Sequence, residues 1–188
     1  MLDVLKLELF SLASILFVIL MLFLTHKYVS ENKRKYCYLV SAILCVLVHY
    51  SYFLYQLITG TVDGVPANLY LPQWPCNIMM WLILVVAVMN FNKENIVLKY
   101  LYYITSWIGV FCAILGLCCN FNFLGTPDFS DYNIFKGLLS HVFLLYCCLY
   151  PFVERKADYE FFKVTLSLII SGVIFVVCGN YSVIFSKL

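Results

Sequence analysis

Long apolar segments recur along the whole chain and constrain its fold more than any other feature. Six segments of about 20 predominantly apolar residues, each long enough to cross about 30 Å of hydrocarbon as a helix, follow one another. The residues are 64% apolar and 12% charged, whereas soluble domains are about half apolar and a quarter charged. The sequence therefore predicts an all-α polytopic membrane protein, a single domain over residues 1–188 with about six transmembrane helices at 5–25, 36–59, 72–91, 96–119, 132–152 and 161–181.

Basic residues mark alternate connections between these segments. The first, third and fifth connections carry nine of the 12 lysines and arginines: Lys27, Lys33, Arg34, Lys35, Lys93, Lys99, Arg155, Lys156 and Lys163. Because such residues stay on the cytoplasmic side of spans, we expect both termini to be extracytoplasmic. The first segment is too long for a signal-peptide core and lacks a cleavage site, so we expect it to remain as a helix. A net charge of +2 does not indicate a nucleic-acid partner.

The nine cysteines lie mostly within apolar segments and lack the paired spacing of a zinc site or a disulfide framework. We therefore expect most of them to pack as small buried side chains, with no bound metal and no cofactor. Gly109, Ala113 and Gly116 form a small-residue stripe at helical spacing in the fourth segment. Such stripes allow helices to approach closely, so we assign this one to packing.

Polar side chains within membrane spans are costly, which makes each one a candidate for function. Cys76 lies at the outer end of the third segment, His141 about 13 Å along the fifth from Tyr132, and Asn180 at the outer end of the sixth. A thiol, an imidazole and an amide are the groups of a cysteine acyl-transfer site, in which the imidazole takes the thiol proton. The first turn of a helix also favours negative charge on a thiol. The opposing interpretation is a packing cysteine and a histidine that bridges helices.

His49 is the other histidine within a predicted span. It could line a cavity, but we favour a hydrogen bond to a neighbouring helix. The candidate catalytic residues are thus Cys76 and His141, and the candidate substrate contacts are Asn180, Asn77, Gln73 and His49.

Three short motifs resemble a known family. Residues Tyr70 to Ile78 include Leu-Pro-x-x-x-Cys, the Ser140-His141 pair precedes an apolar run, and Asn180-Tyr181 lies near the carboxyl end. In order and spacing these resemble the YwaF-like integral membrane proteins, a bacterial group related to the eukaryotic transmembrane protein 164. The resemblance implies a helical protein of the bacterial plasma membrane that transfers acyl groups between phospholipids. It also implies a thioester on Cys76, with His141 as the base.

Three functions are compatible with these patterns. The first is a phospholipid acyltransferase or acyl hydrolase, whose partners are membrane phospholipids. The second is a substrate-binding subunit or transporter for a small molecule, because six helices in fewer than 200 residues is also the size of small importer subunits. The third is a structural or assembly partner without chemistry. The sequence identifies no protein partner.

Overall fold

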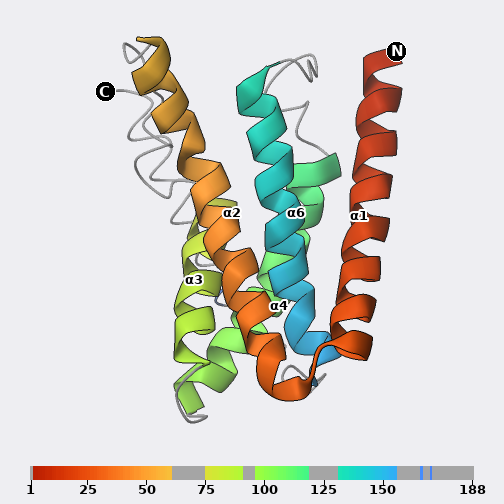
Figure 1. The fold of residues 1–188 in the computed structure, drawn as a ribbon, viewed down its shortest axis with the longest axis vertical. Helices are drawn as coiled ribbons and strands as arrows, with labels where there is room; N and C mark the ends of the chain where they lie inside the picture. The colour runs from red at the N-terminus through yellow and green to blue at the C-terminus, as the bar shows by residue number, and fades with distance from the viewer. Residues whose placement is uncertain are drawn as a thin grey trace.

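The computed structural model describes residues 2–60, 75–90, 96–118, 131–155, 166 and 170. The described residues form five helices, which confirms the all-α prediction for this part of the chain. Four of these helices are long and apolar enough to cross a membrane. The helices are α1 (Leu2–Tyr28), α2 (Glu31–Thr59), α3 (Pro75–Met89), α4 (Ile96–Cys118) and α6 (Tyr132–Val153) (Figure 1).

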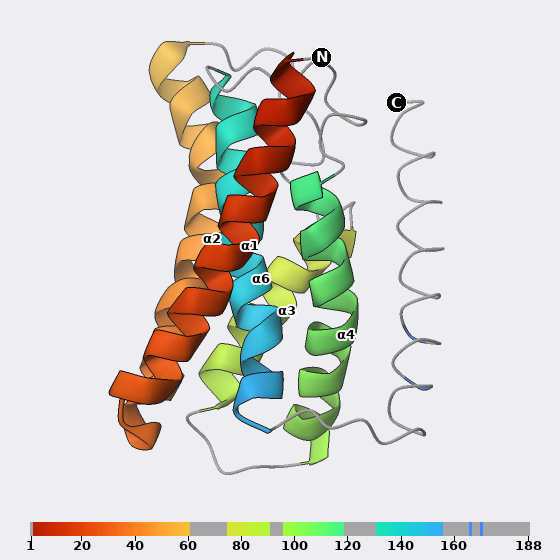
Figure 2. The ribbon, with the colours of Figure 1, turned by 90° about the vertical axis from the view of Figure 1, so that its right-hand side faces the viewer.

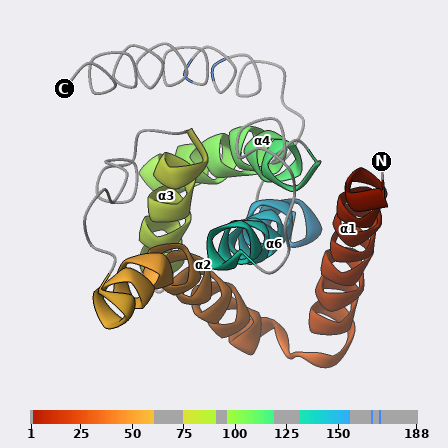
Figure 3. The same ribbon diagram turned by 90° about the horizontal axis from the view of Figure 1, so that it is seen from above.

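Helix α6 lies at the centre of the bundle. Viewed from above, α1, α2, α3 and α4 surround it (Figure 3). In the apolar stretch of α6, 72% of the residues are buried, whereas the share for α1 and for α2 is 22%. The outer faces of α1 and α2 instead expose large apolar side chains such as Leu16, Phe17 and Leu47, as expected for surfaces in contact with lipid. The central helix is therefore the one around which a buried site can be built.

The two ends of the bundle can be named after the residues that flank α6. At the Asp131 end, a carboxylate oxygen of Asp131 accepts a hydrogen bond from the Asn133 N–H at 2.8 Å, which caps the first turn of α6. Helix α2 ends toward the same end at Gly60, whose left-handed backbone (φ 70°) suits glycine and lets its N–H bond to the Gln56 carbonyl. At the Glu154 end, α6 stops and the two-residue connection between α1 and α2 turns the chain around (Figure 2).

A charged cluster joins three helices at the Glu154 end. Arg34 Nη1 lies 3.1 Å from Glu154 Oε1, and His26 Nδ1 lies 3.2 Å from the same oxygen. Arg34 also donates from Nε to the Val29 carbonyl at 2.9 Å and from Nη2 to the His26 carbonyl at 2.6 Å. Next to His26 on α1, Thr25 has its hydroxyl 3.1 Å from that of Tyr146, about two turns before Glu154 on α6. We call His26, Arg34 and Glu154 the Arg34 cluster. It ties the α1–α2 connection to the end of α6.

The helices differ from the predicted spans at their ends. Helix α2 starts at Glu31 rather than at residue 36, because the charged residues before the apolar stretch also adopt helical geometry. Helix α3 has 15 residues, about 22 Å at 1.5 Å per residue, and is shorter than a span requires. It begins partway down the bundle, below the ends of α2 and α6 (Figures 1 and 2). The sixth predicted span, 161–181, lies outside the described residues except for Leu166 and Ile170, which are helical.

The basic residues of the described chain gather mostly at the Glu154 end. The ends of α1 and α6 and the starts of α2 and α4 meet there. These segments carry Lys27, Lys33, Arg34, Lys35, Lys99 and Arg155. The separation of charge that underlies the topology is therefore present, and the side of the membrane that this end faces stays a prediction.

Candidate functional site

The ring of His141 packs against α4 in the half of α6 nearer the Asp131 end. A side-chain carbon added at Gly116 of α4 would overlap this ring, so the close approach of the imidazole requires glycine there. Two turns further along α6, Cys148 packs against Gly109 of α4 in the same way. A side-chain carbon added at Gly109 would overlap the Cys148 thiol. The assignment of the small-residue stripe to helix packing is therefore confirmed. At Gly116 that packing also positions a candidate catalytic group.

One nitrogen of His141 is held by a hydrogen bond, and the other has no partner among the described residues. Nδ1 lies 2.6 Å from the Gly137 carbonyl oxygen, which only accepts hydrogen bonds, so Nδ1 carries the ring proton. Nε2 of the neutral ring is then an acceptor. It is buried and has no hydrogen-bond partner among the described residues, while the side chain as a whole is 9% exposed. The ring is thus oriented through Nδ1, and Nε2, which packs against Gly116 of α4, keeps a lone pair without a described donor. A neutral imidazole with such a lone pair has the protonation state that a general base requires.

Cys76 lies in the first turn of α3 and is half-buried. Its Sγ lies 3.6 Å from the side-chain oxygen of Asn77, to which the thiol donates. Asn77 itself is 5% exposed. Cys76 also lies close enough to Cys45 and Lys136 to interact with both electrostatically. The start of α3 thus brings a thiol to the polar groups of α2 and α6.

His49 of α2 faces the same region and is 8% exposed. Its ring packs edge-on against Tyr50, with the centroids 5.0 Å apart, and it interacts electrostatically with Lys136 and His141. We predicted a hydrogen bond from His49 to a neighbouring helix. In the part of the chain that the structure describes none is present, and Nε2 is buried without a partner. The alternative, a ring that lines the site, fits these observations better.

Lys136 is a member of the site that the sequence interpretation missed. It lies on α6 five residues before His141, and its side chain is 5% exposed. The Nζ atom sits 5.3 Å from the centre of the Tyr52 ring, a cation–π contact. In sequence Lys136 comes just after the fourth connection, near the start of the fifth predicted span. It lies four residues inside the predicted span that begins at 132. A charged residue within a span is a candidate for function, so this position could have identified it.

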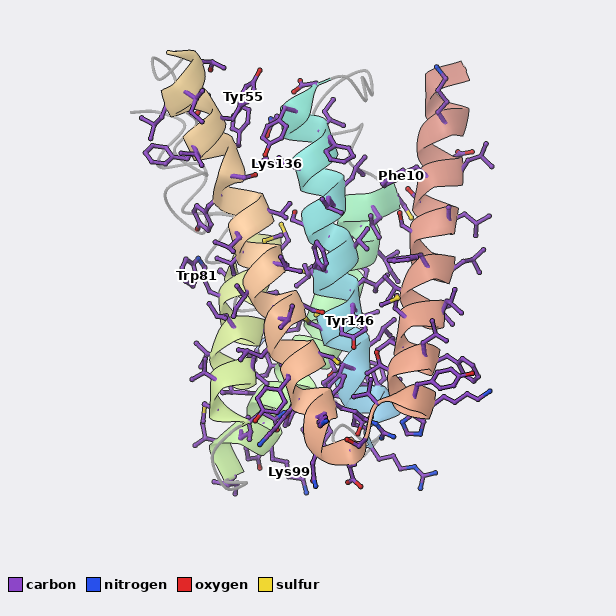
Figure 4. The ribbon with its side chains drawn as sticks, in the orientation of Figure 1. Phe10, Tyr55, Trp81, Lys99, Lys136 and Tyr146 are labelled. Carbon is purple, nitrogen blue, oxygen red and sulfur yellow. The ribbon has the colours of Figure 1, made fainter. Side chains whose placement is uncertain are left out.

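Three tyrosines cover the site at the Asp131 end. Tyr55 and Tyr132 stack with their ring centres 4.8 Å apart, and Tyr52 lies 6.0 Å from Tyr55 and 6.3 Å from Tyr132. The Tyr132 hydroxyl donates to the Ser51 hydroxyl at 2.7 Å, which in turn donates to the Val48 carbonyl at 2.6 Å. We call Tyr52, Tyr55 and Tyr132 the tyrosine stack. Figure 4 shows Lys136 and Tyr55 between α2 and α6, at the opposite end of the bundle from Lys99.

The structure thus gathers most of the predicted site residues but does not bond the two central ones. Helices α2, α3 and α6 bring together His49, Cys76, Asn77, Lys136 and His141. No hydrogen bond joins Cys76 to His141, since the thiol donates to Asn77 and the His141 Nε2 has no described partner. Gln73 and Asn180 lie outside the described residues. Two further cysteines, Cys45 and Cys147, donate to backbone carbonyls at 3.2 and 3.8 Å, as packed thiols do.

Comparison with known proteins gives one match. The model of the TMEM164 family matches residues 4–186, which is nearly the whole chain. No curated protein and no solved structure matches the chain. The match covers the described helices apart from the first two residues of α1, and it includes the positions of all the candidate site residues. It bears out the relation to transmembrane protein 164 that the three motifs indicated. The chain belongs to the TMEM164 family.

Proposed function

We propose that this membrane protein is a lipid acyltransferase or acyl hydrolase in which Cys76 is the nucleophile and His141 is the base. The observation that carries the proposal is the state of the His141 ring. Its Nδ1 is fixed to the Gly137 carbonyl, and its buried Nε2 has no partner among the described residues. Leaving a buried acceptor unpaired costs about 1–3 kcal/mol, a cost that is understandable where the atom must accept a proton during a reaction.

The first half of the reaction would form a thioester. The Cys76 thiol turns from Asn77 toward His141 and gives its proton to Nε2, and the thiolate attacks an ester carbonyl of a phospholipid. The carbon–oxygen bond to the glycerol then breaks. The leaving alkoxide takes the proton back from Nε2, so a lysophospholipid departs and the acyl group remains on Sγ. Backbone N–H groups and the positive end of the α3 dipole, at the first turn where Cys76 lies, favour both thiolate and oxyanion.

The second half would release the acyl group. A hydroxyl of an acceptor lipid, or of water, gives its proton to Nε2 and attacks the thioester carbon. The carbon–sulfur bond breaks, and the thiolate recovers the proton from His141. An acceptor lipid makes the protein a transferase, and water makes it a hydrolase. The ring nitrogen serves as base and acid in turn, as the histidine of other acyl-transfer sites does.

The proposal is tested by lipid turnover in liposomes. Purified Cys76→Ser and His141→Ala proteins are reconstituted with a phospholipid whose acyl chain is isotopically labelled, and the labelled products are measured. Cys37→Ser and His26→Ala are the matched controls, because Cys37 is also half-buried and both residues lie near the Glu154 end. We expect the first pair to lose turnover and the controls to keep it. Unchanged turnover in Cys76→Ser would exclude the mechanism. If, in addition, a small molecule copurified with the Cys76→Ser protein, a binding or transport role would be favoured.

A further inference from the structure

The site contains a buried lysine that has no carboxylate beside it among the described residues. Lys136 is 5% exposed, and no carboxylate lies within ion-pair distance of its Nζ among the described residues. Asp131 interacts with it only at longer range. The Tyr52 ring contributes a cation–π contact, which neutralises no charge. Isolated charges within membrane spans are costly, and they commonly mark sites where a ligand completes the pairing.

Among the described residues, the side chains close to Lys136 do not supply the missing negative charge. His49 and His141 interact with it electrostatically and add no negative charge. The side-chain oxygen of Gln56, one turn from Tyr52 on α2, is buried without a partner in the described part of the chain. The unsatisfied groups therefore lie on both α2 and α6. A group that accepts hydrogen bonds from Lys136 and carries a negative charge would satisfy the most costly of them.

The depth of Lys136 indicates which anionic group this is. Lys136 precedes His141 by five residues on one helix, so it lies about 7.5 Å nearer the Asp131 end. A glycerophospholipid has the same order, because its phosphate lies toward water and its ester carbonyls lie one glycerol unit nearer the hydrocarbon. A phosphate at Lys136 would direct the esters toward the level of His141 and Cys76.

We infer that Lys136, positioned on the Tyr52 ring between α2 and α6, binds the phosphate group of a phospholipid and so positions the acyl ester. The choice of a lipid-borne phosphate rests on the proposed function, whereas the phosphate site itself rests on the unpaired lysine. Lys136 is then a substrate-binding residue that sets how deeply the lipid enters. Inorganic phosphate shares the recognised chemistry, and the experiment separates the two sources.

Binding is measured at equilibrium with protein purified in a maltoside detergent, which contains no phosphate. The probes are dihexanoyl phosphatidylglycerol, dihexanoylglycerol with the same chains but no phosphate, and inorganic phosphate. All variants are made in the Cys76→Ser protein so that no ester is consumed. Lys136→Met removes the charge and keeps the length, Lys136→Arg keeps the charge, and Lys99→Met is the matched control at an exposed lysine near the Glu154 end.

We expect Lys136→Met to weaken binding of dihexanoyl phosphatidylglycerol by about tenfold or more, since a charge-assisted hydrogen bond is lost. Binding of dihexanoylglycerol should stay unchanged, and Lys136→Arg and Lys99→Met should bind like the parent. Unchanged phosphatidylglycerol binding in Lys136→Met, or an equal loss for both lipids, would overturn the inference. Inorganic phosphate that binds as tightly as the lipid, in a manner dependent on Lys136, would overturn the lipid source.

A second measurement avoids substitutions. In the protein with native Lys136, dihexanoyl phosphatidylglycerol should protect this lysine from acetylation by an active ester, and dihexanoylglycerol should not. Equal acetylation with both lipids would contradict a phosphate contact. Because neither measurement requires turnover, the phosphate site and the proposed catalysis can fail separately.

Discussion

The two ends of the bundle both contain buried or half-buried polar groups. The charged groups at the Glu154 end are paired, whereas several polar groups at the Asp131 end have no described partner. At the Glu154 end, the Glu154 carboxylate receives both Arg34 and His26, and Arg34 also bonds to two carbonyl groups. At the Asp131 end, Lys136 has no described anion, and the Nε2 atoms of His49 and His141 have no described partner. Paired groups hold helices together. Unpaired groups are a cost that a substrate can offset, and this contrast distinguishes the structural cluster from the candidate site.

The contrast makes the two ends separable by mutation. Replacing Lys136 or His141 by a side chain of similar size should lower activity with little loss of stability, because the Lys136 Nζ and the His141 Nε2 have no described hydrogen-bond or ion-pair partner whose loss would weaken the fold. Changes in the Arg34 cluster should lower stability and leave the activity of the folded protein intact.

The largest effect is expected for His141→Gln, which keeps a polar side chain and removes the proposed base. Acyl transfer should fall by about 10²–10⁴-fold, the usual contribution of a general base. The thermal unfolding temperature in detergent should change little. Turnover in liposomes and the unfolding temperature are measured on the same preparation. A large fall in unfolding temperature with turnover per folded molecule intact would place His141 with the structural residues instead.

Paired glycine substitutions test whether packing of α4 positions the ring of His141, the proposed base. Gly116→Ala places a carbon against His141, and Gly109→Ala places one against Cys148. Each should destabilise the protein by about 1–3 kcal/mol through overpacking. Only Gly116→Ala should also reduce acyl transfer by the folded protein, because only it moves the ring. Equal activity losses in the two variants would show that general distortion of the α4–α6 contact, rather than the position of His141, is responsible.

Glu154→Gln tests the structural end. The Glu154 side chain is 9% exposed, so loss of its charge leaves Arg34 without its carboxylate partner. We expect the free energy of unfolding to fall by about 1–3 kcal/mol, as measured by denaturant titration in mixed micelles. Turnover by the remaining folded protein should equal that of the parent. A selective loss of turnover would mean that the Arg34 cluster affects the candidate site, and it would contradict the separation of the two ends.

The smallest effects are expected where α1 attaches to the bundle. Ser11 donates to the Leu117 carbonyl at 2.7 Å, and the Thr25 hydroxyl lies 3.1 Å from that of Tyr146. Ser11→Ala and Thr25→Val should each reduce the free energy of unfolding by about 0.5–1.5 kcal/mol. Ser11 bonds beside Gly116, and Thr25 is next to His26 in sequence, but neither hydroxyl belongs to the carboxylate pair or to the candidate site, so neither change should alter turnover. A fall of more than about 3 kcal/mol in the free energy of unfolding for either variant would show that the hydroxyl contributes more than a single hydrogen bond.

Much of the fold followed from the sequence because membrane helices carry a simple signal. Twenty apolar residues in a row predict a helix whatever they pack against, and four predicted spans coincide in the main with α1, α2, α4 and α6. The ends were less predictable. Residues 31–35 are polar, four of them charged, and lack the apolar signal, yet they form the first turn of α2 because the backbone can stay helical outside hydrocarbon.

The candidate site was only partly predictable, for a different reason. Sequence gives the depth of a residue along its helix, which placed Cys76 and His141 in the same half of the bundle. It does not give the rotation of each helix or its partners. The contact between Lys136 and Tyr52 crosses 84 positions of sequence, so no local pattern contains it. The unpaired state of His49 likewise depends on which neighbours its ring meets.

The most direct test of the central claim is the mass of the Cys76 peptide after brief exposure to phospholipid. Protein in liposomes is quenched in acid and digested, and the peptide is examined with and without hydroxylamine, which cleaves thioesters. We expect the mass of one acyl group on Cys76, removed by hydroxylamine and absent in His141→Gln. If lipid turns over while Cys76 stays unmodified, and Cys76→Ser turns over lipid at the same rate, the Asp131 end does not work as the thioester mechanism requires.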